Sequence, residues 1–400
     1  MLLRNTFHTT YCTNIHPGGD WKETFGALED HLEAIRGNVS PGQPFGLGLR
    51  LSDQASRELD AGNRLADFKA WLDARDIYVF TMNGFPFGAF HGTAVKDRVH
   101  EPDWTTRERL DYTLRLFRQL EFLAGEGREA GISTSPVSYR HWFRSPAEKS
   151  DALRAGARNM ARVAAALYSR ERDTGVYLHL DIEPEPDGLL ENTREVLDFY
   201  RDYLIPEGAA YLETELGLDT ATARKAVLRH ITICYDICHF ALAYEGPEHV
   251  FGLLGKAGIR VGKIQVSAAL RIRPDGAGRD MALRTLAEFD EPVYLHQVTR
   301  RTPEGVETWP DLPELLQDPP EFEELRAHFH VPIFAEGYGA LGATQREILE
   351  VLEYLVEHPD ACRHLEVETY TWDVLPDGLK STLSESISRE LGWLRKALKA

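Results

Sequence analysis

The feature that most constrains this chain is a regular alternation of short β-rich runs with longer amphipathic helical patterns. Eight β-rich runs are expected, at residues 7–15, 44–52, 76–84, 131–139, 175–183, 230–238, 260–268 and 364–372. Helical patterns are expected at residues 21–36, 60–74, 106–130, 146–170, 190–204, 247–257, 344–358 and 381–398. Strands that alternate with helices pair in parallel, and eight such units close into a (β/α)₈ barrel. We therefore predict an α/β chain in which residues 1–400 form a single TIM-barrel domain.

One connection is much longer than the others. Residues 271–343 separate the seventh expected strand from the next crossover helix, and they contain two further β-rich pieces, at 293–298 and 328–334. A segment that follows a barrel strand emerges at the C-terminal mouth, and loops of this length are usually functional. We expect this insertion to form a lid whose two β-rich pieces pair with each other. His296, His328 or His330 would then contact a ligand, and a plain connector is the alternative.

Composition excludes several classes of partner. The 45 Lys and Arg residues are outnumbered by 63 Asp and Glu residues, giving a net charge of −18, and the basic residues are scattered. A nucleic-acid surface needs clustered basic residues, so nucleic acid is not an expected partner. No run of about 18 apolar residues and no secretory leader pattern is visible, which argues against membrane insertion. With only four cysteines, too few for a disulfide framework, the chain is expected to be cytoplasmic.

Acidic side chains gather where the fifth and sixth expected strands end. The alternation of strand residues places Asp181, Glu183 and Glu185 on one side, and Asp236 and His239 stand three apart at the next strand end. Buried carboxylates are costly unless they are paired or bound to a cation. A structural ion pair is one interpretation of these acids, and a divalent cation held by carboxylate and imidazole is the other.

The seventh and eighth expected strands extend the polar pattern. Gln265 lies within the seventh, where a buried amide must find hydrogen bonds or a ligand, and Glu366 and Glu368 share a face of the eighth. Four strand ends therefore carry an oxygen-rich ring made of Glu183, Asp236, Gln265 and Glu368. Such a ring suits Mg²⁺, Mn²⁺ or a similar ion.

The first three expected strands end in neutral or cationic donors instead. These are Asn14 and His16 after the first strand, Arg50 on the second and Asn83 on the third. Such groups orient the hydroxyl or carbonyl oxygens of a small polar ligand, and we take them as candidate substrate-binding residues together with Glu185. Each has a plainer interpretation as a turn or exposed loop residue.

Nine segments spread along the whole chain carry a family resemblance. The chain resembles the EboE-type metabolite traffic proteins, which belong to the xylose isomerase-like TIM barrel superfamily. The segments are YCTNIHPGGDW (11–21), QPFGLGLRLS (43–52), YVFTMNGFPFGAFHG (78–92), DIEPEPDGLLENT (181–193), CYDICHFA (234–241), GKIQVSAAL (262–270), YLHQV (294–298), HFHVPIF (328–334) and VETYTWDVLP (367–376).

The resemblance implies roles for several of these residues. In metal-dependent epimerases of the superfamily, carboxylates at the matching strand ends bind the metal and move protons. Carried over, Glu183 and Glu368 would be metal ligands and the acid/base pair, Asp236 a metal ligand, and His239 a contact to a substrate hydroxyl. The seventh strand departs from the pattern, because Gln265 stands where the family pattern has a His.

The resemblance also implies a setting. It suggests a protein that acts on or handles a secondary-metabolite precursor destined for the periplasm, together with other proteins of the same export pathway. Three hypotheses follow: a metal-dependent sugar isomerase or epimerase, a non-catalytic protein that binds the metabolite in the same pocket, and a metal-free hydrolase using two carboxylates. The crowding of acids favours a metal, whose identity (Mn²⁺, Mg²⁺, Zn²⁺ or similar) stays open. It also stays open whether His296 or His330 takes the place of Gln265 as a metal ligand.

Overall fold

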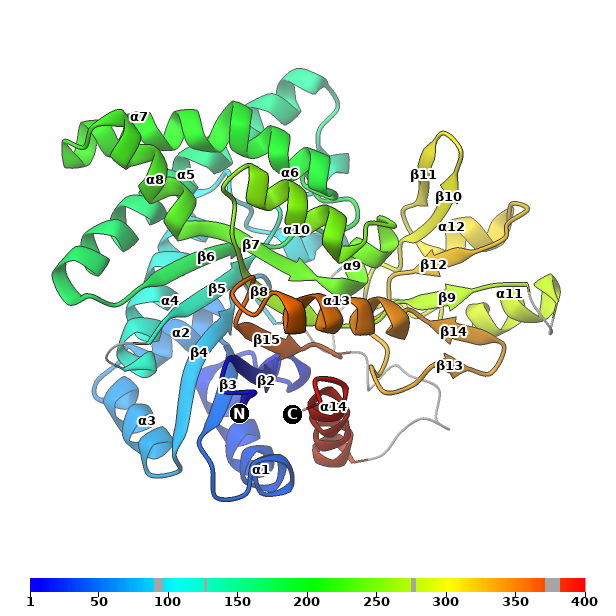
Figure 1. The fold of residues 1–400 in the computed structure, drawn as a ribbon, viewed down its shortest axis with the longest axis horizontal. Helices are drawn as coiled ribbons and strands as arrows, with labels where there is room; N and C mark the ends of the chain where they lie inside the picture. Colours follow the sequence, from blue (N-terminus) through cyan, green and yellow to red (C-terminus); the bar gives the residue numbers. More distant parts are fainter. Residues whose placement is uncertain (90–95, 126–127, 275–277, 371–381, 400) are drawn as a thin grey trace.

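Eight parallel strands form a barrel in the computed structural model, which describes residues 1–89, 96–125, 128–274, 278–370 and 382–399 (Figure 1). Their hydrogen-bonded order is β2-β15-β8-β7-β6-β5-β4-β3, so the first and last strands of the chain are neighbours. A short strand, β1 (Leu2–Leu3), pairs antiparallel with β2. The eight strands are β2 (Phe7–Tyr11), β3 (Phe45–Arg50), β4 (Ile77–Asn83), β5 (Ala130–Thr134), β6 (Leu178–Ile182), β7 (Ile231–Asp236), β8 (Val261–Val266) and β15 (His364–Val367). The predicted α/β barrel is confirmed.

The barrel closes between β2 and β3 through a narrow contact. Cys12 and Gly48 form an isolated parallel bridge, and the Gly48 N–H donates to Thr10 Oγ1 at 3.1 Å. A Cβ added at Gly48 would lie 1.7 Å from Oε1 of Glu366, a residue of β15. Glycine is therefore required here by the close approach of a side chain from a third strand.

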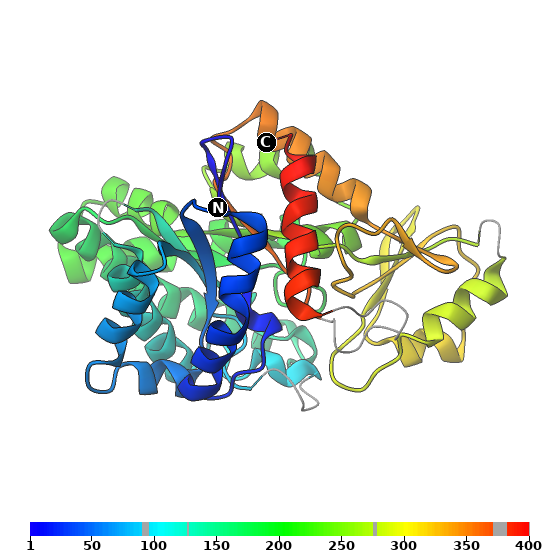
Figure 2. The ribbon, with the colours of Figure 1, turned by 90° about the horizontal axis from the view of Figure 1, so that it is seen from below.

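Helices connect the strands and cover the barrel. No helix among the described residues combines the length and the apolar character that crossing a membrane requires. The helix α14 packs against α1 near the N-terminus (Figure 2). The helices are α1 (Trp21–Val39), α2 (Asp53–Leu59), α3 (Arg64–Asp73), α4 (Arg107–Ala124), α5 (Pro146–Thr174), α6 (Thr193–Phe199), α7 (Ile205–Leu216), α8 (Thr220–His230), α9 (Ile237–Leu242), α10 (Pro247–Lys256), α13 (Gln345–Glu357) and α14 (Leu383–Ala397). Residues 371–372 of the eighth expected strand and residue 381 of the last expected helix lie outside the described residues.

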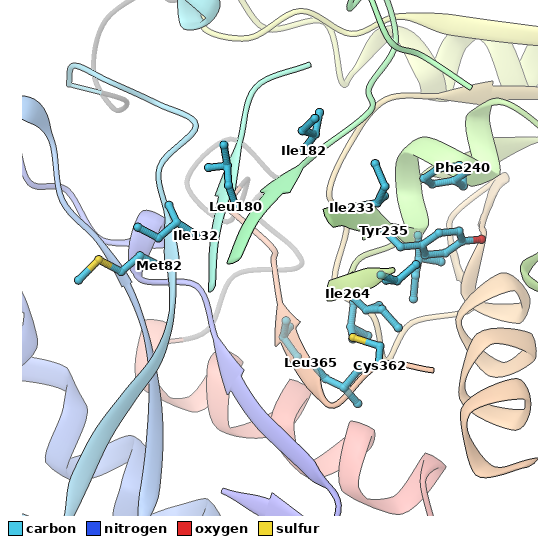
Figure 3. Close-up of a cluster of buried hydrophobic side chains, with 14 of the residues drawn as sticks. Met82, Ile132, Leu180, Ile182, Ile233, Tyr235, Phe240, Ile264, Cys362 and Leu365 are labelled. Atoms are coloured by element: carbon cyan, nitrogen blue, oxygen red, sulfur yellow. The ribbon is translucent and has the colours of Figure 1, made fainter. Parts of the chain in front are cut away.

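The two faces of the barrel strands differ in polarity. Apolar side chains such as Ile132, Leu180 and Ile233 belong to one large hydrophobic cluster with the covering helices (Figure 3). The alternate residues meet across the barrel, as shown by Lys263 of β8, which donates to Ser133 Oγ of the non-adjacent β5 at 3.2 Å. The barrel interior is therefore a polar layer, whereas the apolar core lies between sheet and helices.

The insertion folds as a second sheet beside the barrel mouth (Figure 1). Its order is β11-β10-β12-β9-β14-β13, and all its pairs are antiparallel. The two expected β-rich pieces do not themselves pair as strands; they adjoin β10 and β12, and the His328 N–H donates to the Gln297 carbonyl at 2.8 Å. The elements are β9 (Leu270–Ile272), α11 (Arg279–Ala287), β10 (Val298–Thr302), β11 (Gly305–Trp309), α12 (Leu312–Gln317), β12 (Leu325–Ala327), β13 (Gly337–Tyr338) and β14 (Leu341–Ala343).

Candidate functional site

Three buried carboxylates converge at the C-terminal ends of the strands. Glu183, Asp236 and Glu368 each offer an oxygen within 4.8 Å of the others. Glu183 directly follows β6 and its N–H donates to the Thr134 carbonyl, so the strand pairing continues by one residue. The Glu368 N–H likewise donates to the Val266 carbonyl at 3.2 Å. Backbone pairing therefore fixes the positions from which these two side chains project.

Asp236 is oriented by its role at a helix start. It is the N-cap of α9, and its Oδ1 accepts hydrogen bonds from the His239 N–H at 3.1 Å and from Ser267 Oγ at 2.7 Å. No described residue donates a hydrogen bond to Oδ2, which is fully buried. One oxygen is thus held by the protein, and the other is available to a ligand.

Two asparagines fix the third carboxylate. Glu368 Oε1 accepts hydrogen bonds from Asn14 Nδ2 at 2.6 Å and from Asn83 Nδ2 at 3.0 Å. The Asn83 side chain is itself oriented, because its Oδ1 accepts from the Phe85 N–H at 3.0 Å. Both asparagines predicted from the sequence therefore lie at this site, where they contact Glu368.

The electrostatics of this cluster favour a bound cation. Burial raises the pKa of Glu183 well above its usual range, and the charges of Glu368 and Asp236 raise it further. Burial likewise raises the pKa of Glu368, with Asp236 adding to the effect. Within the described ranges, no Lys or Arg forms an ion pair with any of the three. The charge of Lys263 lowers the pKa of both glutamates by less than burial and the neighbouring acids raise it. Oxygen donors that crowd together without a directly paired cation match the preferences of a divalent metal ion.

Gln265 lies beside the cluster in the sheet. It is fully buried on β8 and stands in register with Asp236 on one side and Glu366 on the other. No described residue forms a hydrogen bond with either atom of its amide. Its proposed role as a weak metal ligand stays a prediction.

Histidines from the barrel and from the insertion meet above the carboxylates. His239, at the start of α9, places Nε2 at 3.1 Å from His328 Nε2, and His330 Nδ1 donates to the Glu368 carbonyl at 2.9 Å. Two further groups could hold a metal ion: Asp236 with His239 and His330, and Cys238 with His328 and His330. Burial, reinforced by the neighbouring imidazoles, lowers the pKa of His328, and burial lowers that of His330 to about 4.

His296 occupies a supporting position rather than the expected ligand contact. Its Nδ1 donates to the His328 carbonyl at 2.9 Å, and its Nε2 lies 2.7 Å from Glu291 Oε1. The ring stacks on Phe329 with 3.7 Å between centroids. Both ring nitrogens are therefore engaged within the insertion, and His296 is not among the residues that line the main pocket. Its expected contact to a ligand stays a prediction.

His16 and Arg50 also have contacts other than the expected ones. The His16 ring stacks on His31, and its Nε2 lies 3.0 Å from the Tyr11 hydroxyl. Arg50 donates to the carbonyls of Gly18 and Gly88. Both residues line a second, smaller hollow and are not among the residues that line the main pocket. Their expected role in ligand binding stays a prediction.

The main pocket is lined by both polar and apolar side chains. It encloses about 590 Å³ of space, including the part open to solvent. Glu185 lies here in a buried pair with His100, at 2.9 Å, and Lys96 pairs with Asp311 of the insertion at 2.6 Å. The lining residues are Asn14, Asn83, Phe85, Pro86, Lys96, Val99, His100, Glu183, Glu185, His239, Tyr294, Leu295, Gln297, His328, His330, Glu368 and Tyr370.

Several of these lining residues were not expected from the sequence. Lys96 and His100 lie in a short 3₁₀ helix, η2 (Lys96–His100), and Tyr370 lies beyond the end of β15. Such short segments have no periodic pattern that assigns the direction of a side chain, so no sequence signal identified these residues. Tyr294 begins the segment YLHQV (294–298) of the insertion, but only the fold shows that it lines the pocket.

Comparison with known proteins identifies similar barrels only at low identity. No protein-family model and no curated protein matches the chain. Among solved structures, it is similar to a xylose isomerase-like TIM barrel protein from Mycobacterium smegmatis in complex with magnesium, at 10% identity, covering 100% of this chain and 98% of that one, with a TM-score of 0.49. A D-tagatose 3-epimerase-like protein has 10% identity, coverage of 98% and 97%, and a TM-score of 0.48. An IOLI protein with a bound zinc atom has 10% identity, coverage of 98% of both chains, and a TM-score of 0.45. At these values the likeness assigns neither an activity nor a metal to this chain.

Proposed function

We propose that this chain is a metal-dependent, sugar isomerase- or epimerase-like protein that acts on or handles a small secondary-metabolite precursor. The observation that supports this proposal is the convergence of Glu183, Asp236 and Glu368 at the barrel mouth. In the proposal residues 1–400 act as one domain, with residues 271–343 as its lid. A divalent cation such as Mn²⁺, Mg²⁺ or Zn²⁺ at these oxygens would polarise a carbonyl or hydroxyl oxygen of the ligand.

The chain's own residues supply the proton chemistry. One of the carboxylates Glu183 and Glu368 takes a proton from the carbon beside a carbonyl, and the other returns a proton to the carbon skeleton. The two asparagine donors hold Glu368 in one orientation beside the other two carboxylates.

The pocket wall supports a substrate with two chemically different ends. Phe85, Val99 and Leu295 offer apolar contacts, and the carboxylates, asparagines and histidines offer polar ones. A hydroxyl- or carbonyl-bearing group would face the carboxylates, and a less polar group would lie against the apolar residues. A small metabolite that carries both kinds of group suits this lining.

The resemblance to EboE-type proteins supports a role in metabolite traffic. In this part of the proposal, the protein works with others of one pathway to export the precursor to the periplasm. The alternative is that the same pocket only holds the metabolite and releases it to a partner. Residues of the insertion line the pocket, and a covered pocket suits a carrier as well as an enzyme. The two candidate functions therefore differ in whether a reaction takes place and not in the shape of the pocket.

The test compares two substitutions on the same strand segment. Purified wild type, Glu368→Gln and Glu366→Gln are dialysed against Mn²⁺, Mg²⁺ or Zn²⁺, and the bound metal is counted by mass spectrometry. Each protein is then incubated with dihydroxyacetone or fructose in D₂O, and loss of carbon-bound protons is followed by NMR. We expect stoichiometric metal and exchange in the wild type, loss of exchange and of one equivalent of metal in Glu368→Gln, and retained metal in Glu366→Gln.

The outcomes separate the candidate functions. Bound metal without exchange supports the carrier reading. Absence of stoichiometric metal from the wild type overturns the metal-dependent proposal in both forms. Equal loss of metal and exchange in both variants would show that the site needs Glu366 as much as Glu368, which contradicts the specific role given to Glu368.

A further inference from the structure

Two imidazole rings face each other with their Nε2 atoms 3.1 Å apart. His239 belongs to the barrel and His328 to the insertion, and both are buried. Their rings are nearly perpendicular, with 4.8 Å between centroids. This contact joins the insertion directly to the barrel mouth.

The hydrogen bonds on the far side of each ring determine its tautomer. His239 Nδ1 lies 3.0 Å from the Pro184 carbonyl, which only accepts, so this nitrogen carries a proton. His328 Nδ1 lies 2.8 Å from Gln297 Oε1. The amide orientation of Gln297 follows from its Nε2, which donates to the Pro186 carbonyl at 3.3 Å. His328 Nδ1 is therefore also a donor.

Both Nε2 atoms consequently present lone pairs to each other. Two acceptors at this distance repel unless a positive group lies between them or beside them. Two imidazole nitrogens bound to one tetrahedral Zn²⁺ at 2.0–2.1 Å lie about 3.3 Å apart, close to the observed spacing. Imidazoles whose Nδ1–H donates to a carbonyl or amide oxygen are the usual metal-binding arrangement, because the outer partner fixes ring and tautomer.

We propose that His239 and His328 form a second, nitrogen-rich cation site beside Asp236 and His330. His330 belongs to two possible ligand groups, one with Asp236 and His239 and one with Cys238 and His328, and Asp236 also belongs to the carboxylate group. Asp236 would thus lie between two ions, and its buried Oδ2 lies 3.9 Å from His330 Nε2. The inference deepens the proposed function and rests on it for the first ion.

The donor set indicates which ion the second site takes. Imidazole nitrogen suits Zn²⁺ or Co²⁺, whereas the oxygen-only group suits Mg²⁺ or Mn²⁺ as well. Because one histidine comes from each part of the fold, an ion held here would also fasten the insertion over the pocket. Cys238 lies nearby, but its thiol donates to the Phe329 carbonyl at 3.5 Å and burial raises its pKa, so it is the weaker ligand.

The experiment is a titration of the metal-free, full-length protein with Co²⁺. Tetrahedral Co²⁺ bound by nitrogen gives strong visible absorption, so the second site is read separately from total bound metal. The variants are His328→Gln, which removes a ligand, Gln297→Ala, which removes its orienting partner, and Glu183→Gln, which removes a carboxylate ligand. His296→Gln is the matched control, since it removes a histidine of the insertion that faces Glu291 instead. Circular dichroism verifies that each variant is folded.

We expect the wild type and His296→Gln to bind two equivalents with the absorption band. His328→Gln should bind one equivalent without the band, and Gln297→Ala should bind the second ion about 10–100-fold more weakly. Glu183→Gln should lose the other equivalent. If His328→Gln binds as the wild type does, or if the wild type binds a single ion that only Glu183→Gln abolishes, a proton lies between the imidazoles. The second site is then refuted while the first stands. Absence of any bound ion refutes both.

Discussion

Breaking the ion pair inside the barrel should destabilise the fold strongly. Lys263 Nζ lies 2.6 Å from Glu366 Oε2, and both side chains are fully buried. Burial lowers the pKa of Lys263, but the attraction of Glu366 outweighs this effect, so the net pKa of Lys263 lies above its usual value and its amine is charged. Lys263→Met therefore leaves a buried carboxylate without its counter-charge.

The size of the effect follows from this geometry. Removing one partner of a fully buried pair costs about 3–5 kcal/mol, whereas replacing both by apolar groups is often neutral or stabilising. For Lys263→Met we take about 4 kcal/mol, because Lys263 also loses its contact to Ser133. With a urea dependence of about 3 kcal/mol per M or somewhat more, the unfolding midpoint should fall by about 1 M. The double variant Lys263→Met with Glu366→Met should recover most of this loss.

The assay is urea unfolding of the metal-free protein, followed by circular dichroism, for the wild type, both single variants and the double variant. The double-mutant cycle then yields the interaction energy between the two positions. If this energy is below about 0.5 kcal/mol, or if the double variant is less stable than either single one, Lys263 and Glu366 do not depend on each other. The polar barrel interior would then be held by other contacts.

Three further sets of substitutions test the close contact at Gly48 and the buried titratable groups His230 and Glu191. Gly48→Ala places a methyl group against Glu366, so urea unfolding should show a loss of about 1–3 kcal/mol or more, whereas Gly26→Ala in α1, where nothing lies within 4 Å, should gain about 0.5–1 kcal/mol. Burial lowers the pKa of His230 to about 4, below the unfolded value of about 6.5, so its contribution is present above pH 6.5 and is lost as the pH falls toward 4. Thermal unfolding from pH 7.5 to 4.5 should therefore show a smaller decline in His230→Gln than in the wild type. Burial raises the pKa of Glu191 to about 7, so its contribution is present below about pH 4.5 and is lost as the pH rises through 7. Glu191→Gln should therefore raise the melting temperature at pH 8 but not at pH 4.5.

The strand positions were predictable because alternation of polarity is local. All eight expected strands were found, and their differences from expectation have local causes. The run expected at 131–139 forms a strand only over Ala130–Thr134, since Pro136 lacks an N–H and Val137 has a φ of 72°. The helix α2 was not expected, although Ser52 is a recognisable cap that accepts from the Ala55 N–H at 2.9 Å.

The site was predictable only as far as strand geometry reaches. Strand ends bring Glu183, Asp236 and Glu368 together because parallel strands share one carboxyl edge. Periodicity also placed Glu366 and Glu368 on the same face of their strand. It could not show that Lys263 pairs with Glu366 and not with Glu368, because this depends on the height of each side chain along the barrel axis, which sets its distance from side chains of other strands. The direction of His296 was likewise beyond reach, since its segment is not a regular strand.

The two acidic layers of the barrel differ in how their charge is neutralised. In the inner layer Lys263 neutralises Glu366, and Asp181 accepts hydrogen bonds from His179 and Thr232. In the layer above, within the part of the chain that the structure describes, no Lys or Arg forms an ion pair with the carboxylates at the mouth. Burial and the mutual repulsion of these carboxylates raise the pKa of Glu183, and the charge of Lys263 from the inner layer lowers it by less. A chain that needed these acids only for folding would gain stability from a second buried cation there, or from apolar residues. The repulsion between the carboxylates at the mouth is consistent with a cation supplied from solution. For this reason the proposed metal site depends on the carboxylates at the barrel mouth and not on the acidic composition of the whole chain.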